Sequence, residues 1–175
     1  MRVQHLAVLS ALLISAVAAV ALAQNSPSSA HADFINSQGQ KIGTAHLTQT
    51  PDGVKIDVRV SQLPPGTHAF HIHTVGKCEA PDFKSAGGHF NPAGKQHGKD
   101  NPMGAHVGDM MNFEVGADGR ARFSVVNAAV TLGDGANSLF HEGGTALMIH
   151  EKADDYKTDP TGNAGNRLAC GVIEK

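Results

Sequence analysis

Residues 54–60 read VKIDVRV, a run in which β-branched apolar residues alternate with charged ones. Alternation with a period of two places the four valine and isoleucine side chains on one face of a strand and the charged side chains on the other. The preceding Pro51-Asp52-Gly53 sequence is typical of a tight turn. This stretch therefore predicts a half-buried β-strand that packs on a core through one face.

The same pattern recurs along the chain. Further strand candidates are residues 40–48, 111–115, 121–125 and 146–150. Residues 111–115 and 121–125 flank the turn sequence Ala117-Asp118-Gly119 and predict a β-hairpin. No segment has a helical period, and the 20 glycines favour turns over helices. We expect an all-β sandwich or barrel.

Two long segments lack the strand pattern. Residues 76–110 are rich in glycine, proline, histidine and lysine, and residues 152–167 are a second polar stretch. Long loops in a compact domain are usually functional or disordered. Because the first segment carries three histidines and a cysteine, we expect two ordered functional loops.

The first 31 residues have a different composition from the rest. Residues 6–23 are apolar and end in Ala21-Leu22-Ala23, an A-x-A pattern typical of signal-peptidase cleavage. The alternative is an uncleaved membrane anchor, since about 18 apolar residues are at the lower edge of a span. We predict a signal peptide at 1–23, a flexible leader at 24–31 and one domain at 32–175. The mature protein is then periplasmic or extracellular, with no stable membrane association.

The chain has two cysteines, Cys78 and Cys170. In an oxidising compartment they are expected to form a disulfide, and two free buried thiols are the alternative.

Composition narrows the class of function. The formal net charge is −2 and no basic run occurs, which gives no support for nucleic-acid binding. The 11 histidines are the unusual feature, and their spacing has to distinguish surface residues from metal ligands.

Six histidines lie at positions that favour metal binding. His71 and His73 are two residues apart on a predicted strand, so both imidazoles leave the same face, outward from the core. His150 ends another strand and lies on its outer face. In the long loop, three histidines and an aspartate occur within 21 positions, a donor set that suits zinc; they are His89, His97, His106 and Asp109.

The ordered set of motifs resembles the copper–zinc superoxide dismutases. The match runs from about residue 32 to the C-terminus and includes the loop sequences around the two cysteines. The motifs are His71-Ile72-His73, Gly88-His89-Phe90-Asn91-Pro92, His97-Gly98, His106-Val107-Gly108-Asp109, His150 to Asp155, and Gly162 to Gly171. The resemblance implies a Greek-key β-sandwich or flattened barrel, and an enzyme that dismutates superoxide to dioxygen and hydrogen peroxide.

The resemblance also implies a role for each site residue. Copper would be bound by His71, His73, His89 and His150, and zinc by His89, His97, His106 and Asp109, so that His89 bridges the two metals. Asp154 would connect His71 with His97, as outer carboxylates commonly do at metal sites. Arg167 would guide the anionic substrate, Thr161 would narrow the channel on the other side, and Cys78 would pair with Cys170.

We expect the remaining histidines to be surface or structural residues. As a set, the lysines on or beside the two loops could steer superoxide electrostatically; they are Lys77, Lys84, Lys95, Lys99, Lys152 and Lys157.

The alternatives to the enzyme are a copper-only dismutase, a non-enzymatic metal-delivery module on the same fold and a module that uses zinc only for stability. Both a monomer and a homodimer are compatible with the sequence.

Overall fold

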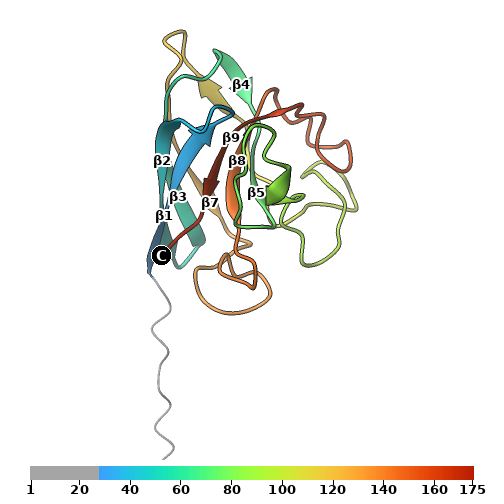
Figure 1. Ribbon diagram of the computed structural model, residues 1–175. Helices are drawn as coiled ribbons and strands as arrows, with labels where there is room; N and C mark the ends of the chain where they lie inside the picture. The colour runs from blue at the N-terminus through green and yellow to red at the C-terminus, as the bar shows by residue number, and fades with distance from the viewer. Residues whose placement is uncertain (1–27) are drawn as a thin grey trace, which may run out of the picture.

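The computed structural model describes residues 28–175, and the predicted signal peptide lies outside the described residues (Figure 1). Within residues 28–175, nine strands and one short 3-10 turn make up the regular structure. In chain order they are β1 (Ser29–Asn36), β2 (Lys41–Thr50), β3 (Gly53–Val60), β4 (Gly66–His68), β5 (Phe70–His73), the 3-10 turn (Lys84–Ala86), β6 (Phe113–Val115), β7 (Ala121–Asn127), β8 (Ala146–His150) and β9 (Arg167–Val172). The all-β prediction is confirmed.

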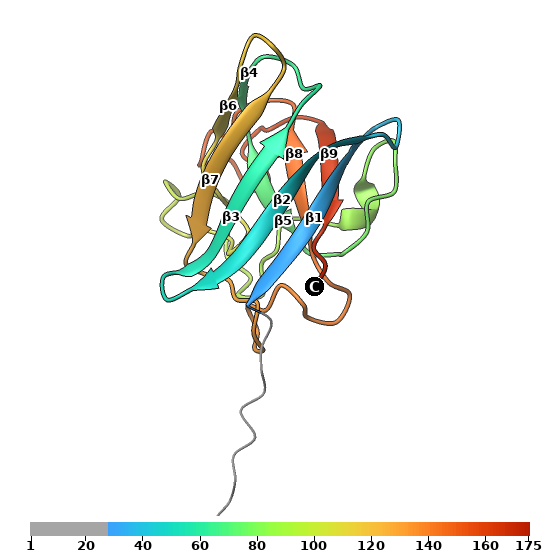
Figure 2. The same cartoon turned by 90° about the vertical axis from the view of Figure 1, so that its left-hand side faces the viewer.

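All strand pairs are antiparallel. Seven strands form one curled sheet in the order β5-β8-β9-β1-β2-β3-β7, and β4 pairs with β6 in a separate two-stranded sheet (Figure 2). The chain passes from the small sheet to the large one at Ala69, between β4 and β5. Among the described residues, no helix is long and apolar enough to cross a membrane.

One boundary and one strand pairing differ from the sequence prediction. Strand β1 begins at Ser29, and residues 29–31 pair with β2, so the predicted leader reaches into the sheet. The strands at 111–115 and 121–125 exist as β6 and β7 but do not form the predicted hairpin. Instead β6 pairs with β4 and β7 pairs with β3, because the turn at residues 116–120 carries the chain from one sheet to the other.

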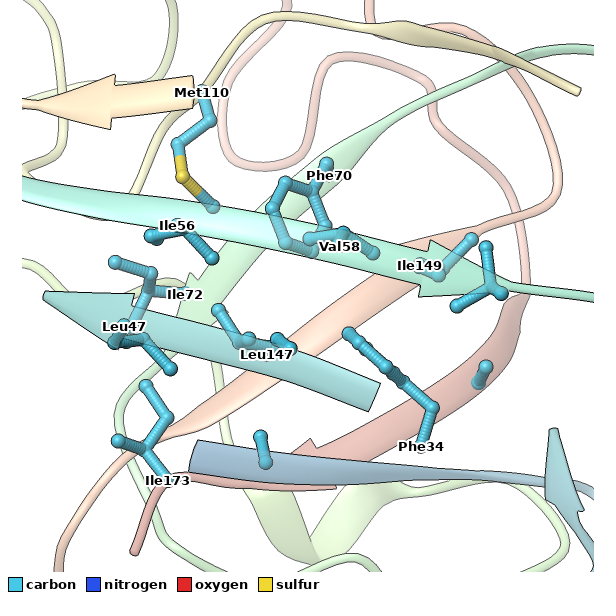
Figure 3. Packing of buried hydrophobic residues seen from close by; sticks show 14 of the residues in the cluster. Phe34, Leu47, Ile56, Val58, Phe70, Ile72, Met110, Leu147, Ile149 and Ile173 are labelled. Carbon is cyan, nitrogen blue, oxygen red and sulfur yellow. The ribbon is translucent and has the colours of Figure 1, made fainter. Parts of the chain in front are cut away.

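The core fills the concave side of the curled sheet. The alternating residues of β3 enter it as expected, since Val54, Ile56 and Val58 are fully buried. Figure 3 shows Phe70 and Ile72 of β5 and Leu147 and Ile149 of β8 meeting the residues of β2 and β3 in this core.

A third long connection, residues 128–145, joins β7 to β8. It is not one of the two loops predicted from the sequence. Three of its apolar side chains are buried in the core, Val130, Leu132 and Leu139. This segment therefore closes one end of the sheet with apolar packing. The first predicted loop also adds apolar side chains to the core, those of Phe90 and Met110.

Replacing Leu147 by alanine tests this core. Leu147 is fully buried on β8 between β5 and β9. We expect Leu147→Ala to lower the free energy of unfolding by about 2–5 kcal/mol, through lost burial and the cavity left behind. The measurement is urea unfolding of the metal-free protein followed by circular dichroism.

Val126→Ala on β7 is the matched control, because this side chain is exposed. It should change the free energy of unfolding by less than about 0.5 kcal/mol. Equal effects of the two substitutions would contradict the described core.

Candidate metal centre

Strands β5 and β8 place three histidines on the convex side of the sheet. On β5, Phe70 and Ile72 pack into the core, so His71 and His73 leave the opposite face, as predicted. His150 is the last residue of β8, after a register shift that follows Ile149. The three imidazoles point away from the core but are nevertheless buried, because the long loop covers them.

The long loop lies directly along β5. Ile72 donates its N–H to the carbonyl of Gly108 at 2.9 Å, and its own carbonyl accepts the N–H of Phe90 at 2.8 Å. A Cβ on Gly108 would be 2.4 Å from the carbonyl oxygen of Ile72, so only glycine allows this approach. The backbone contacts bring His89 beside His73 and Asp109 beside His71.

One cluster contains four buried imidazoles, those of His71, His73, His89 and His150. One ring nitrogen from each lies within 4.8 Å of the others. In the described part of the chain, the Nδ1 atom of His71 and the Nε2 atom of His89 are buried without a hydrogen-bond partner. The Nε2 atoms of His73 and His150 face each other at 3.3 Å. Buried polar atoms normally have a partner, so these converging nitrogens fit a bound transition metal.

The second cluster converges on one oxygen atom. Oδ1 of Asp109 lies 2.9 Å from Nδ1 of His89, 3.0 Å from Nδ1 of His97 and 3.2 Å from Nδ1 of His106. The other oxygen, Oδ2, accepts the backbone N–H groups of Gly98 and His106, which orients the carboxylate. Three imidazoles and one carboxylate form a closed four-ligand set of the kind that zinc occupies.

His89 belongs to both clusters through its two ring nitrogens. Its Nδ1 atom faces Asp109, whereas its Nε2 atom faces the rings of His71, His73 and His150. Burial lowers the pKa of His89 to about 4, so the ring is neutral and able to act as a ligand near neutral pH.

Asp154 connects the two clusters. Its Oδ2 atom lies 2.8 Å from Nε2 of His71, and its Oδ1 atom lies 2.9 Å from Nε2 of His97. Each ring is thereby held with Nδ1 directed into its own cluster, which is the usual arrangement around metal-binding histidines. A Cβ on Gly162 would overlap Oδ1 of Asp154, so glycine is required there as well.

The titration of the other site residues follows from burial and these contacts. Burial holds the pKa values of His73 and His150 well below their ordinary range. For His97, burial opposes protonation, but hydrogen bonds to Asp109 and Asp154 outweigh it and raise the pKa to about 9. Burial favours the neutral form of both carboxyls, yet their hydrogen bonds keep both pKa values well below the usual range. The carboxylates are therefore charged at neutral pH.

Three residues that the sequence analysis missed support the loops. Asn112 exchanges two hydrogen bonds with the backbone of Asp154, and the hydroxyl of Tyr156 accepts the N–H of Asn112. Asp159 accepts the backbone N–H of His97. Tyr156 is the only tyrosine of the chain, but the amino-acid composition gave no sign of this contact.

Arg167 is held at the edge of the first cluster. Its two terminal nitrogens donate to the carbonyls of Phe83 and Gly87, each at 2.6 Å. The carbonyl of Gly87 also accepts from Nδ1 of His73 at 2.9 Å. A single backbone oxygen thus positions both the guanidinium and one imidazole.

The disulfide predicted between Cys78 and Cys170 is present and attaches this loop to β9. A cavity of about 420 Å³ is lined by Arg167 together with Lys84 and Asp82. Thr161 is exposed in a turn and does not line this cavity.

Two histidines outside the clusters differ in their surroundings. His68 is buried and bonds through its two nitrogens to the carbonyls of Pro64 and His150, a structural role as expected. His141 is half-buried and stacks on Phe90 with ring centroids 5.0 Å apart.

The comparisons with known proteins agree with this geometry. Residues 41–173 match the family model for copper/zinc superoxide dismutase. "Superoxide dismutase [Cu-Zn] 1" of Aquifex aeolicus is 58% identical over 82% of this chain and 86% of its own length. "Superoxide dismutase-like protein YojM" of Bacillus subtilis is 42% identical over 82% of this chain and 74% of its own length. Among solved structures, the Cu/Zn superoxide dismutase from Brucella abortus has a TM-score of 0.67 at 30% identity, covering 83% of this chain and 99% of that one.

The fold and the paired histidine clusters define a β-sandwich metalloprotein. The family match and the relatives make the class specific: the chain belongs to the copper/zinc superoxide dismutase family. Its activity is superoxide dismutation, and its cofactors are copper and zinc, as the sequence analysis expected.

The contact of Asp154 with both clusters leads to a prediction. Asp154→Asn replaces one carboxylate oxygen by an NH₂ group, which cannot accept from His71 or His97. We expect the affinity for metal to fall by about 10–100-fold, as for other outer-carboxylate substitutions. Competition titration of the metal-free protein with zinc and a chelator measures this affinity.

Asp155→Asn is the control, because Asp155 is exposed and its hydrogen bonds are with Thr158, Asn163 and the backbone of its own loop. An unchanged zinc affinity for Asp154→Asn would contradict the connecting role.

Proposed function

We propose that His71, His73, His89 and His150 bind copper in this protein, and that His89, His97, His106 and Asp109 bind zinc. The observation that carries this assignment is the convergence of buried nitrogens without protein partners in the first cluster, beside a closed three-histidine, one-carboxylate set in the second. In this assignment His89 is shared, with Nε2 on the copper side and Nδ1 on the zinc side.

Dismutation converts two superoxide ions and two protons to dioxygen and hydrogen peroxide. When bound, copper supplies the one-electron redox chemistry, while zinc has none and serves as a structural ion. The protein has to hold the imidazoles in place, admit a small anion and deliver protons. The Nε2 atom of His89 is suited to hold a proton between the two half-reactions, because Nδ1 is turned toward Asp109 and keeps the ring in place.

Arg167 supplies the positive charge at the entrance. A guanidinium has five N–H donors. In Arg167, each of the two terminal nitrogens uses one N–H for a hydrogen bond, one to the carbonyl of Phe83 and the other to that of Gly87. The remaining donors are available to orient superoxide, and the carbonyl contacts prevent the side chain from swinging away. Thr161 stays our proposal for the opposite wall of the channel.

The loop lysines differ in their ability to steer the substrate. The Nζ atom of Lys84 lies in an ion pair with Asp82, and that of Lys99 in one with Asp100, which reduces their fields. Within the described residues, the other four candidates make no such pair; they are Lys77, Lys95, Lys152 and Lys157. Steering of the anionic substrate therefore rests mainly on Arg167 and these four lysines. Superoxide dismutase is itself a standard example of such steering.

We further propose that residues 1–23 are a signal peptide and that the protein acts in the periplasm or outside the cell. The Cys78–Cys170 disulfide supports this location, because such bonds persist in oxidising compartments.

A substitution in the first cluster tests the copper assignment. We expect wild type loaded with copper and zinc to contain one of each metal per chain and to dismutate superoxide. His71→Ala should lose copper and reduce the activity to background, because one of four ligands and the contact with Asp154 are removed together. Metal analysis and a superoxide-consumption assay give the two readouts.

His46→Ala is the matched control, since His46 is exposed on β2 and lies outside both clusters. It should keep both metals and full activity. Stoichiometric zinc without copper and without activity in wild type would instead indicate a structural zinc module, and both metals without activity would indicate a metal carrier.

Arg167 has a separate prediction. Arg167→Ala should reduce the second-order rate constant by about 10-fold while both metals stay bound, because the attraction for the anion is lost. Arg167→Lys should recover part of the rate, since the charge returns without the forked donors. Unchanged activity in Arg167→Ala would refute the guiding role.

A further inference from the structure

The outer face of strands β2, β3 and β7 lies away from the metal centre. In Figure 1 the loops at residues 76–110 and 152–167 are on the right and strands β1 to β3 on the left; Figure 2 looks onto this outer face. The face carries a depression of about 750 Å³, larger than the cavity beside Arg167. Its lining is rich in polar and charged side chains from all three strands.

Two arginines face each other in this depression. Arg59 of β3 and Arg122 of β7 are direct cross-strand partners, and both line the depression. Direct partners on one face have Cβ atoms about 4.5–5.5 Å apart, and like charges at this spacing repel. On its other side, Arg59 pairs with Thr44 of β2. Thr44, Arg59 and Arg122 therefore form a row across the three strands, in which Thr44 contributes a hydroxyl group.

Neither guanidinium is neutralised by the protein. In residues 28–175, no carboxylate forms an ion pair with Arg59 or Arg122. The carboxylate that lines the depression, Asp57, lies 2.9 Å from Nζ of Lys55, so these two charges compensate each other. The depression therefore has two uncompensated positive charges on a chain whose formal net charge is −2.

We propose that Arg59 and Arg122 form a binding site for a phosphate group. A guanidinium presents paired N–H donors that match two oxygens of a phosphate, and two opposed guanidiniums match the charge of a dianion. The hydroxyl of Thr44 offers one more donor beside them. Because binding also relieves the repulsion between the two arginines, the site should prefer a doubly charged group over chloride.

The site is independent of dismutation. The phosphate group can belong to a soluble molecule or to a lipid headgroup, and the chemistry of recognition is the same for both. In either case the ligand binds on the face opposite the metal centre and leaves the entrance at Arg167 open.

The primary experiment is a titration of the copper- and zinc-loaded protein with inorganic phosphate at constant ionic strength, followed by NMR chemical shifts. We expect saturable binding with shifts confined to β2, β3 and β7. Arg59→Gln and Arg122→Gln should each weaken binding by about 10-fold or more, because each removes a charge-assisted pair.

Arg120→Gln is the matched control. Arg120 is exposed in the turn before β7, does not line the depression and carries the same charge. It should weaken phosphate binding much less than the other two substitutions do, because Arg120 places no N–H donors in the depression. All three variants should keep wild-type dismutase activity, which shows that they are folded and loaded with metal.

Vesicles that contain phosphatidic acid distinguish the two sources. Vesicle binding that is lost in Arg59→Gln and Arg122→Gln supports a lipid headgroup, whereas binding of free phosphate without vesicle binding supports a soluble ligand. The proposal is overturned if neither probe binds saturably, or if Arg120→Gln weakens binding as much as the other two substitutions.

Discussion

The two histidine clusters depend on the buried carboxylate of Asp154, which holds one imidazole of each. It accepts from Nε2 of His71 on β5 and from Nε2 of His97 in the long loop, two residues that no backbone pairing connects directly. Each ring can then direct only Nδ1 into its cluster, so the carboxylate sets ring orientation as well as position. The carboxylate is in turn held by the backbone N–H of Tyr156 and by the absence of a side chain at Gly162. The second loop is therefore part of the metal centre although it supplies no ligand to either cluster.

The carbonyl of Gly87 has a similar function at the entrance. It accepts from His73 and from Arg167, so the first cluster and the substrate-guiding charge that we propose depend on the same segment of the loop. The Cys78–Cys170 disulfide attaches that segment to β9, the strand that begins with Arg167. A displacement of the loop would thus disturb His73, a copper ligand in our proposal, and the guanidinium together. The disulfide is itself buried in a small apolar cluster, where Cys170 packs with Phe83 and Met148.

The two faces of the curled sheet serve different purposes. The concave face packs the apolar core, and its rigidity gives β5 and β8 fixed positions for His71, His73 and His150. On the convex side, β5 and β8 are covered by loops, while β2, β3 and β7 stay open to solvent and carry Arg59 and Arg122. The same alternation that buries Val58 and Val60 places Arg59 between them on the open face. One strand thereby contributes to stability through one face and to the proposed anion site through the other.

The sequence by itself determined the strand faces, the family and the pairing of the cysteines. Alternation is a local property, so residues 54–60 revealed which side chains of β3 enter the core. The loop motifs, through their resemblance to a known family, predicted the two groups of residues that the structure brings together and that we propose as ligands. Only the tertiary structure decided what depends on distant segments. It moved β6 out of a hairpin with β7 and into a pair with β4, and it added residues 128–145 to the core. It also buried His71 and His73 under the loop and placed Asn112, Tyr156 and Asp159 behind the ligands. The physical reason is that strand pairing and loop cover arise from contacts between residues far apart in the chain, whereas a sequence pattern reports only the face on which each side chain lies.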